Sequence, residues 1–219
     1  MFTAPSTAHA PRWQRRPDRR PEEILDAALR VFVQRGLHKA KLEEVAQEAG
    51  ISKGTIYLYF KNKEELFVAT ARRVMASIEE LDIEQYLAPS ATTEARLPQL
   101  LRQVAQTAYR HFCTPSYLAF FSMLAAEARR YPEWGELYFR RVLLEVNHRL
   151  AAVFEHAVQT GECRTVDPIL AARAFAGMFL IMALSQEHLG GKKHTPLSER
   201  KVIDSLTDIF LHGILPVRQ

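Results

Sequence analysis

The stretch AGISKGTIYLYF, residues 49–60, combines a tight turn with a short helix that is polar on one face. Gly50 stands where an apolar helical face ends, and a glycine there stops a helix because it tolerates the left-handed conformation. Ser52 then offers a hydroxyl oxygen to the free amides of a new helix, as an N-cap does. The residues therefore predict a helix, a short turn and a second helix. The apolar face before the turn repeats at three and four residues: Leu42, Val45, Ala46, Ala49.

The second of these helices has one face to bury and another to expose. Ile56 and Phe60 lie four residues apart and are expected to pack inside with Ile51. A helix of this kind can enter a DNA major groove, where we expect Lys53 and Tyr57 to reach base edges. Thr55, Tyr59 and nearby lysines would hold phosphates. The predicted DNA-binding residues are Lys41, Ser52, Lys53, Gly54, Thr55, Tyr57, Tyr59 and Lys63.

This segment resembles the DNA-binding signature of the TetR family of bacterial transcription regulators. Members of that family usually carry Ser or Thr at the start of the helix before the turn, whereas this chain has Ala40 and Lys41. Lys41 can contact phosphate, but an ammonium cannot accept the backbone hydrogen bond of a cap. The resemblance rests on Gly36, Leu42, Glu44, Val45, Ala46, residues 49–60 and residues 63–66, roughly the first quarter to third of the chain.

The resemblance implies a homodimeric, all-helical repressor whose larger domain binds a small molecule and then releases DNA. Two recognition helices would enter successive major grooves of a pseudo-palindromic operator, about 34 Å or a multiple apart. Effector binding is expected to move the helix that starts near Asn62 and so to move the two recognition helices apart. The last two helices would pair with their copies as a four-helix bundle, although packing within one chain explains the same apolar spacing.

Positive charge is concentrated near the start of the chain. The 219 residues are 47% hydrophobic and 25% charged, with a formal net charge of +4, which fits a soluble protein with a sizeable core. Residues 1–63 hold 12 Lys and Arg against 7 Asp and Glu, a surplus of +5, and the remaining residues hold 17 against 18, or −1. The DNA-binding interpretation needs the charge in this place. Two cysteines, Cys113 and Cys163, are too few for a disulfide framework and fit a reducing cytoplasm.

We predict an all-α fold in three parts. Residues 1–20 form a basic, mostly disordered arm that is either a solvated tail or a contact to DNA. Residues 21–66 form the helix-turn-helix domain, and residues 67–219 form a larger effector-binding and dimerisation domain. Proline, glycine and capping residues place helices from Pro21 to Gly36, from Asn62 toward Leu87, at 97–112, 115–130, 134–159 and 168–188, and from about Ser198.

No signal peptide is expected, because the start lacks a continuous apolar run. The most apolar run, residues 174–184, is about half of the roughly 20 residues needed to span a bilayer and is interpreted as a buried helix.

Aromatic and thioether side chains in the larger domain suit an apolar or aromatic effector. Only some of them are expected to line a cavity, because such residues also build cores. Arg102 or Glu127 would orient a polar group of the effector. The segment EARRYPEW, residues 127–134, resembles one common in a subgroup of the family and indicates no chemistry by itself. The predicted ligand-binding residues are Tyr109, Tyr117, Phe120, Phe121, Met123, Phe139, Met178 and Met182, with Tyr138 as a further candidate.

Other function classes fit less well. Gly50, Ser52 and Gly54 match the G-x-S-x-G motif of hydrolases, but that motif follows a strand and the flanks here are helical. A serine hydrolase using Ser52 is therefore a remote alternative, and no enzyme activity is expected. His111 and Cys113 lie two residues apart without further placed ligands, so neither a metal nor a cofactor is expected. A transcriptional activator, or a DNA binder without an effector, is the nearer alternative.

Overall fold

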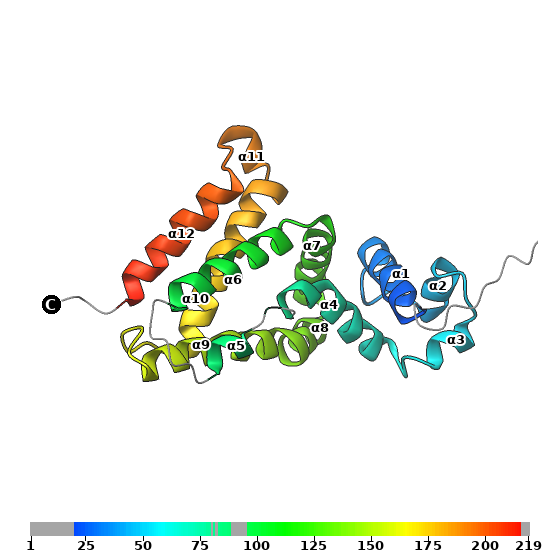
Figure 1. The fold of residues 1–219 in the computed structure, drawn as a ribbon. Helices are drawn as coiled ribbons and strands as arrows, with labels where there is room; N and C mark the ends of the chain where they lie inside the picture. Colours follow the sequence, from blue (N-terminus) through cyan, green and yellow to red (C-terminus); the bar gives the residue numbers. More distant parts are fainter. Residues whose placement is uncertain (1–19, 80, 82, 89–95, 216–219) are drawn as a thin grey trace, which may run out of the picture.

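The computed structural model describes residues 20–79, 81, 83–88 and 96–215, so the basic arm predicted for residues 1–20 lies outside the described residues except for Arg20. Every regular element in the described part is helical, which confirms the predicted fold class. Three helices form a small unit at one end of the molecule: α1 (Arg20–Arg35), α2 (Leu42–Glu48) and α3 (Lys53–Tyr57). The next helix, α4 (Lys63–Glu79), leads from this unit into a larger helical body (Figure 1).

In the larger body, α9 and α10 pack side by side, and α10 also contacts α6 and α12. Short π-helical turns, Phe139–Leu143 and Leu184–His188, follow α8 and α10. The helices of this body are α5 (Glu84–Leu87), α6 (Arg96–Phe112), α7 (Pro115–Arg130), α8 (Pro132–Tyr138), α9 (Leu144–Gln159), α10 (Pro168–Ala183), α11 (Gly191–His194) and α12 (Glu199–Ile214).

The helices of the larger body begin at the side chains that local chemistry favours. Thr114 accepts a hydrogen bond from the backbone N–H of Tyr117 at the start of α7. Asp167 does the same for α10, and Ser198 for α12, so the free amides of each first turn are partly satisfied. These starts match those predicted from the sequence.

One predicted helix end is wrong. The helix that starts near Asn62 ends at Glu79 instead of continuing toward Leu87, because the chain turns and buries Ile83 and Tyr86, and the separate helix α5 packs on α9. The helix predicted for residues 134–159, for which the sequence also allows a kink, ends as predicted at Gln159. It begins slightly earlier, at Pro132, and contains a π-helical turn between α8 and α9. An extra residue in a helical turn shifts the face that follows, so α8 and α9 present different sides to the core.

Phe67 on α4 joins the cores of the two units. Its ring lies edge-on to Phe32 of α1, with centroids 6.3 Å apart, and stacks on Phe120 of α7 at 6.0 Å. Trp134 of α8 closes the cluster at 5.3 Å from Phe67. Since Phe67 is fully buried, α4 belongs to both hydrophobic cores, and a change in the tilt of α4 would alter the packing of both.

The loop between α1 and α2 is held against the larger body by polar and ring contacts. Glu127 of α7 accepts a hydrogen bond from the backbone N–H of His38 at 2.9 Å, and the imidazole of His38 stacks on Tyr131 with centroids 3.8 Å apart. Lys63 donates to the carbonyl oxygen of His38 at 2.9 Å, and its ammonium lies 5.4 Å from the ring centroid of Trp134. The segment EARRYPEW therefore forms the surface on which the DNA-binding unit rests.

One face of α10 is buried and the other is open. Phe175 and Phe179 are fully buried, whereas Leu170 and Ile181 are 63% and 59% exposed. The stretch Pro168–His188 is the one helical stretch among the described residues with the length and composition to cross a membrane. Its mean hydropathy is 1.8, and 28% of its apolar window is buried. The interpretation of residues 174–184 as a buried helix therefore holds for one face only.

Candidate nucleic-acid interface and effector cavity

The turn between α2 and α3 has the geometry that its sequence predicts. Gly50 adopts a φ of +65°, and the chain then returns so that the N–H of Ile51 donates to the carbonyl of Ala46 at 2.9 Å. The Ser52 hydroxyl accepts from the N–H of Thr55 at 3.2 Å. Ile56 is fully buried. These contacts fix α3 rigidly against α2.

The opposite side of α3 faces solvent. Tyr57 is 48% exposed and Tyr59 is 40% exposed, and both rings belong to the exposed large hydrophobic side chains of the described chain. Leu58 is 81% exposed, and sequence reasoning did not single it out. The exposure of Leu58 could have been predicted from its position between two tyrosines that were expected to face outward. The exposed surface of α3 and of the turn at residues 58–59 therefore offers aromatic, aliphatic and cationic groups.

Lys53 is held in place by a carboxylate of the preceding helix. Its ammonium pairs with Glu43 of α2 and lies 5.7 Å from the ring centroid of Tyr57. The hydrogen bond with Glu43 raises the pKa of Lys53, and the same bond lowers the pKa of Glu43. Lys53 therefore stays protonated, and contact with a base or phosphate would replace Glu43 as its partner.

Gly54 has open space on the protein side. A Cβ built at this position would meet only the Ser52 hydroxyl oxygen, at 3.7 Å. Among the described residues, nothing requires glycine at this position.

The start of α2 uses Glu44 in place of the missing Ser or Thr. Lys41 stands at the N-cap and its side chain makes no capping hydrogen bond. Glu44 instead accepts a hydrogen bond from the backbone N–H of Lys41 at 3.0 Å, which is one half of a capping box. The Lys41 side chain remains exposed.

Lys63 has partners other than solvent. Its ammonium donates to the carbonyl oxygens of His38 and Ala40, at 2.9 and 3.2 Å, and burial lowers its pKa. The predicted phosphate contact would require these bonds to break. Lys61 is the better placed cation at this end of α4, since its side chain is 86% exposed and, among the described residues, its ammonium has one ion-pair contact, at 4.0 Å to Glu65.

The larger body contains an apolar cavity of about 270 Å³ between α4, α6, α9 and α10. Two of the predicted ligand-binding residues, Tyr117 and Phe139, line it. The other six do not. Phe120 lies in the junction core against Phe67, and Tyr109 lies beside Cys113 at another surface pocket. The remaining residues outside the cavity lining are Phe121, Met123, Met178 and Met182, and Tyr138 packs on Phe120 and Met75.

The polar groups of the cavity differ from those predicted. Arg102 pairs with Asp204 at the surface, at 3.2 Å, and Glu127 holds the loop of the DNA-binding unit. The cavity lining instead contains Asn147, Arg149 and Arg173. A signal for Arg173 was present in the sequence, because it is the one charged residue within the apolar helix α10.

These features define an all-helical DNA-binding protein with a helix-turn-helix and a separate helical body around an apolar cavity. A family model described as "Bacterial regulatory proteins, tetR family" matches residues 24–70, and one described as "AefR-like transcriptional repressor, C-terminal domain" matches residues 99–213. The chain belongs to the TetR family of bacterial transcriptional regulators, which bind DNA through this motif and are not enzymes.

Similar proteins fall in the same class. The fatty acid metabolism regulator protein of Bacillus subtilis is 36% identical over 75 residues, a match that spans 34% of this chain and 38% of that protein. A structure described as a TetR-family regulator from Mesorhizobium loti superposes with a TM-score of 0.66 at 25% identity, covering 93% of this chain and all of that one. The flavonoid-responsive regulator FrrA superposes with a TM-score of 0.62 at 27% identity, covering 91% and 99%.

Proposed function

We propose that this chain is a ligand-responsive transcriptional repressor that acts as a homodimer on a pseudo-palindromic DNA operator. The observation that carries the proposal is the outward face of α3 and of the turn after it. Lys53 and Tyr57 are exposed on α3, which packs on α2, and Tyr59 is exposed two residues beyond its end. Aromatic and cationic side chains on such a helix suit base edges and phosphates of a major groove. Lys41 and Lys61 would add phosphate contacts on either side.

The open face of α10 supports dimerisation through the last two helices. Leu170, Ala174, Gly177 and Ile181 follow one another at spacings of four, three and four residues, and all four are exposed. Ile209 is an exposed apolar residue on α12, which packs beside α10. A second copy would cover this surface in a four-helix bundle and set the two α3 helices about one DNA turn, roughly 34 Å, or a multiple apart.

The position of the cavity supports an effector that acts through α4. Met75 and Ile78 of α4 line the cavity, and the same helix carries Phe67 in the junction core and follows directly from α3. An effector that fits the cavity better at one tilt of α4 would change the distance between the two α3 helices of the dimer. The apolar lining supports an apolar or aromatic effector body.

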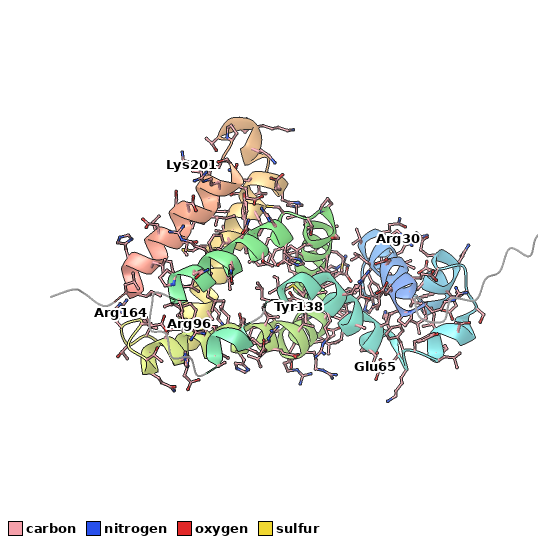
Figure 2. All side chains as sticks on the ribbon, in the orientation of Figure 1. Arg30, Glu65, Arg96, Tyr138, Arg164 and Lys201 are labelled. Atoms are coloured by element: carbon pink, nitrogen blue, oxygen red, sulfur yellow. The ribbon has the colours of Figure 1, made fainter. Side chains whose placement is uncertain are left out.

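Operator binding by single variants tests the DNA-reading proposal. Lys53→Ala and Tyr57→Ala are expected to weaken binding to an inverted repeat upstream of the protein's own gene by 1 to 3 kcal/mol, about 5- to 150-fold, with little change on random DNA. Lys201→Ala, on α12 well away from α3 (Figure 2), is the charge-matched control and should bind as the wild type does. Equal losses on operator and random DNA for Tyr57→Ala would remove this residue from base reading.

A promoter-reporter assay separates repression from the alternatives. Deleting the gene should raise expression from the operator-bearing promoter if the protein represses. A fall in expression would instead indicate an activator. Operator binding that no effector changes would indicate a DNA binder without ligand response.

A further inference from the structure

The charges that line the cavity are all positive. Nineteen residues of the described chain line it, and they include Arg149 and Arg173 but neither aspartate nor glutamate. Most of the other lining side chains are aliphatic or aromatic. An apolar space whose described wall contains cations and no carboxylate favours an occupant that combines an apolar body with a negative charge.

The two arginines differ in what already binds them. Arg149 donates to the carbonyl oxygen of Leu81 at 3.1 Å and lies 3.6 Å from the carboxylate of Glu84. Its charge is therefore used to hold the segment around α5 against α9. This arginine builds the cavity wall and is poorly placed to serve as the main anion contact.

Arg173 has no such partner in the part of the chain that the structure describes. Its guanidinium lies 5.5 Å from the ring centroid of Phe139, and both residues line the cavity. No carboxylate among the described residues forms an ion pair with it. Because Arg173 is exposed and still lines the cavity, it lies at the mouth. A guanidinium over an aromatic ring keeps its in-plane N–H donors available for a carboxylate.

We propose that the cavity binds an amphipathic monocarboxylate, with its carboxylate on Arg173 and its apolar tail among the aliphatic residues between α4 and α9. This rests on the proposed function only for its regulatory meaning, because the binding itself needs no DNA. At about 30 Å³ per group of water size, a cavity of 270 Å³ holds roughly nine such groups. A saturated chain of about ten carbons is therefore a suitable probe.

Calorimetric titration of the full chain with three ten-carbon probes tests the charge preference. Decanoate, decan-1-ol and decyltrimethylammonium share a tail and differ in the head group. Decanoate is expected to bind at least tenfold more tightly than decan-1-ol, since a hydrogen bond between charged groups contributes about 1.5 to 3 kcal/mol. Equal affinity for the alcohol, tighter binding of the cation, or no binding of any probe would overturn the proposal.

Variants of Arg173 test the residue. Arg173→Met should lower decanoate affinity about tenfold or more and leave decan-1-ol within about twofold. Arg173→Lys should keep a preference for decanoate, since it keeps the charge but loses the planar fork. Arg129→Met, which removes an exposed arginine of α7 outside the cavity lining, is the control and should change neither affinity. A parallel loss for decanoate and decan-1-ol in Arg173→Met would show a packing effect and contradict the anion contact.

Operator binding by the same proteins separates this inference from the proposed function. Arg129→Met without a probe should bind operator as the wild type does. If the wild type failed to bind operator but bound decanoate with the predicted preference, the DNA-reading proposal would fail and the carboxylate site would stand. If decanoate bound and left operator affinity unchanged, the site would stand and its regulatory role would fail.

Discussion

Replacing Gly36 with alanine tests the junction between the two units. Gly36 has a φ of +79°, and a Cβ built there would lie 2.8 Å from Oε1 of Glu127. An alanine in this left-handed conformation costs about 1 kcal/mol more than glycine does. The added methyl group would also push Glu127 away from the backbone N–H of His38, and the loss of that hydrogen bond costs about another 1 kcal/mol. The free energy of unfolding should therefore fall by about 2 kcal/mol.

A second glycine supplies the matched control. Gly161 has a φ of +77°, but a Cβ there would meet none of the described residues within 4 Å. Gly161→Ala should therefore lose only the backbone part, about 1 kcal/mol. In a Glu127→Ala background, the loss of unfolding free energy caused by Gly36→Ala should fall to the same value of about 1 kcal/mol, because the carboxylate that the new methyl group would contact is absent.

Urea unfolding followed by circular dichroism measures these differences, and thermal unfolding checks them. For a chain of this size, 2 kcal/mol corresponds to about 4 to 8 °C in Tm. If Gly36→Ala and Gly161→Ala destabilised the protein equally, or if removing Glu127 left the effect of Gly36→Ala unchanged, the steric account of the junction would be refuted.

Three further predictions concern the core and its polar contacts. Phe67→Ala should lower the free energy of unfolding by about 3 to 5 kcal/mol in urea titrations, because the ring is fully buried in the shared core. Burial lowers the pKa of His111 from 6.5 to about 4. As the pH falls from the first value toward the second, the unfolded chain binds a proton that the folded chain does not bind. The free energy of unfolding should therefore drop by about 2 to 3 kcal/mol. His111→Leu should flatten that slope in unfolding experiments between pH 7 and 4.5. Glu162 accepts hydrogen bonds from the N–H of Leu97 at 3.0 Å and the hydroxyl of Tyr86 at 3.1 Å. Glu162→Gln should therefore lower the Tm, with a loss of about 1 to 2 kcal/mol.

Residues 49–60 illustrate what local sequence determines. The stop at Gly50, the cap at Ser52 and the inward position of Ile56 all depend on atoms within four residues of one another, so spacing predicts them. The outward position of Tyr57 follows from the same helical period, whereas Tyr59 lies in the turn after α3 ends. The DNA contacts inferred from that face remain predictions.

The helix after Asn62 shows where local reasoning ends. Nothing in residues 63–79 signals that α4 stops short of Leu87, because the break depends on Ile83 and Tyr86 reaching the surface of α9, far along the chain. The π-helical turn before α9 is equally invisible to apolar spacing. The end of α4 and the π-helical turn both result from packing between segments that are distant in the sequence.

The sequence by itself determined the helical class, the helix-turn-helix and the side of α3 that faces outward, because each depends on neighbours along one helix. Only the tertiary structure decided which aromatic residues line a cavity and which build the junction. Phe120 and Phe139 are both phenylalanines in segments predicted to be helical, yet the first packs on Phe67 and the second lies beneath Arg173. Their roles diverge because burial is a property of the segments that meet a side chain, and those segments are brought together only by the fold.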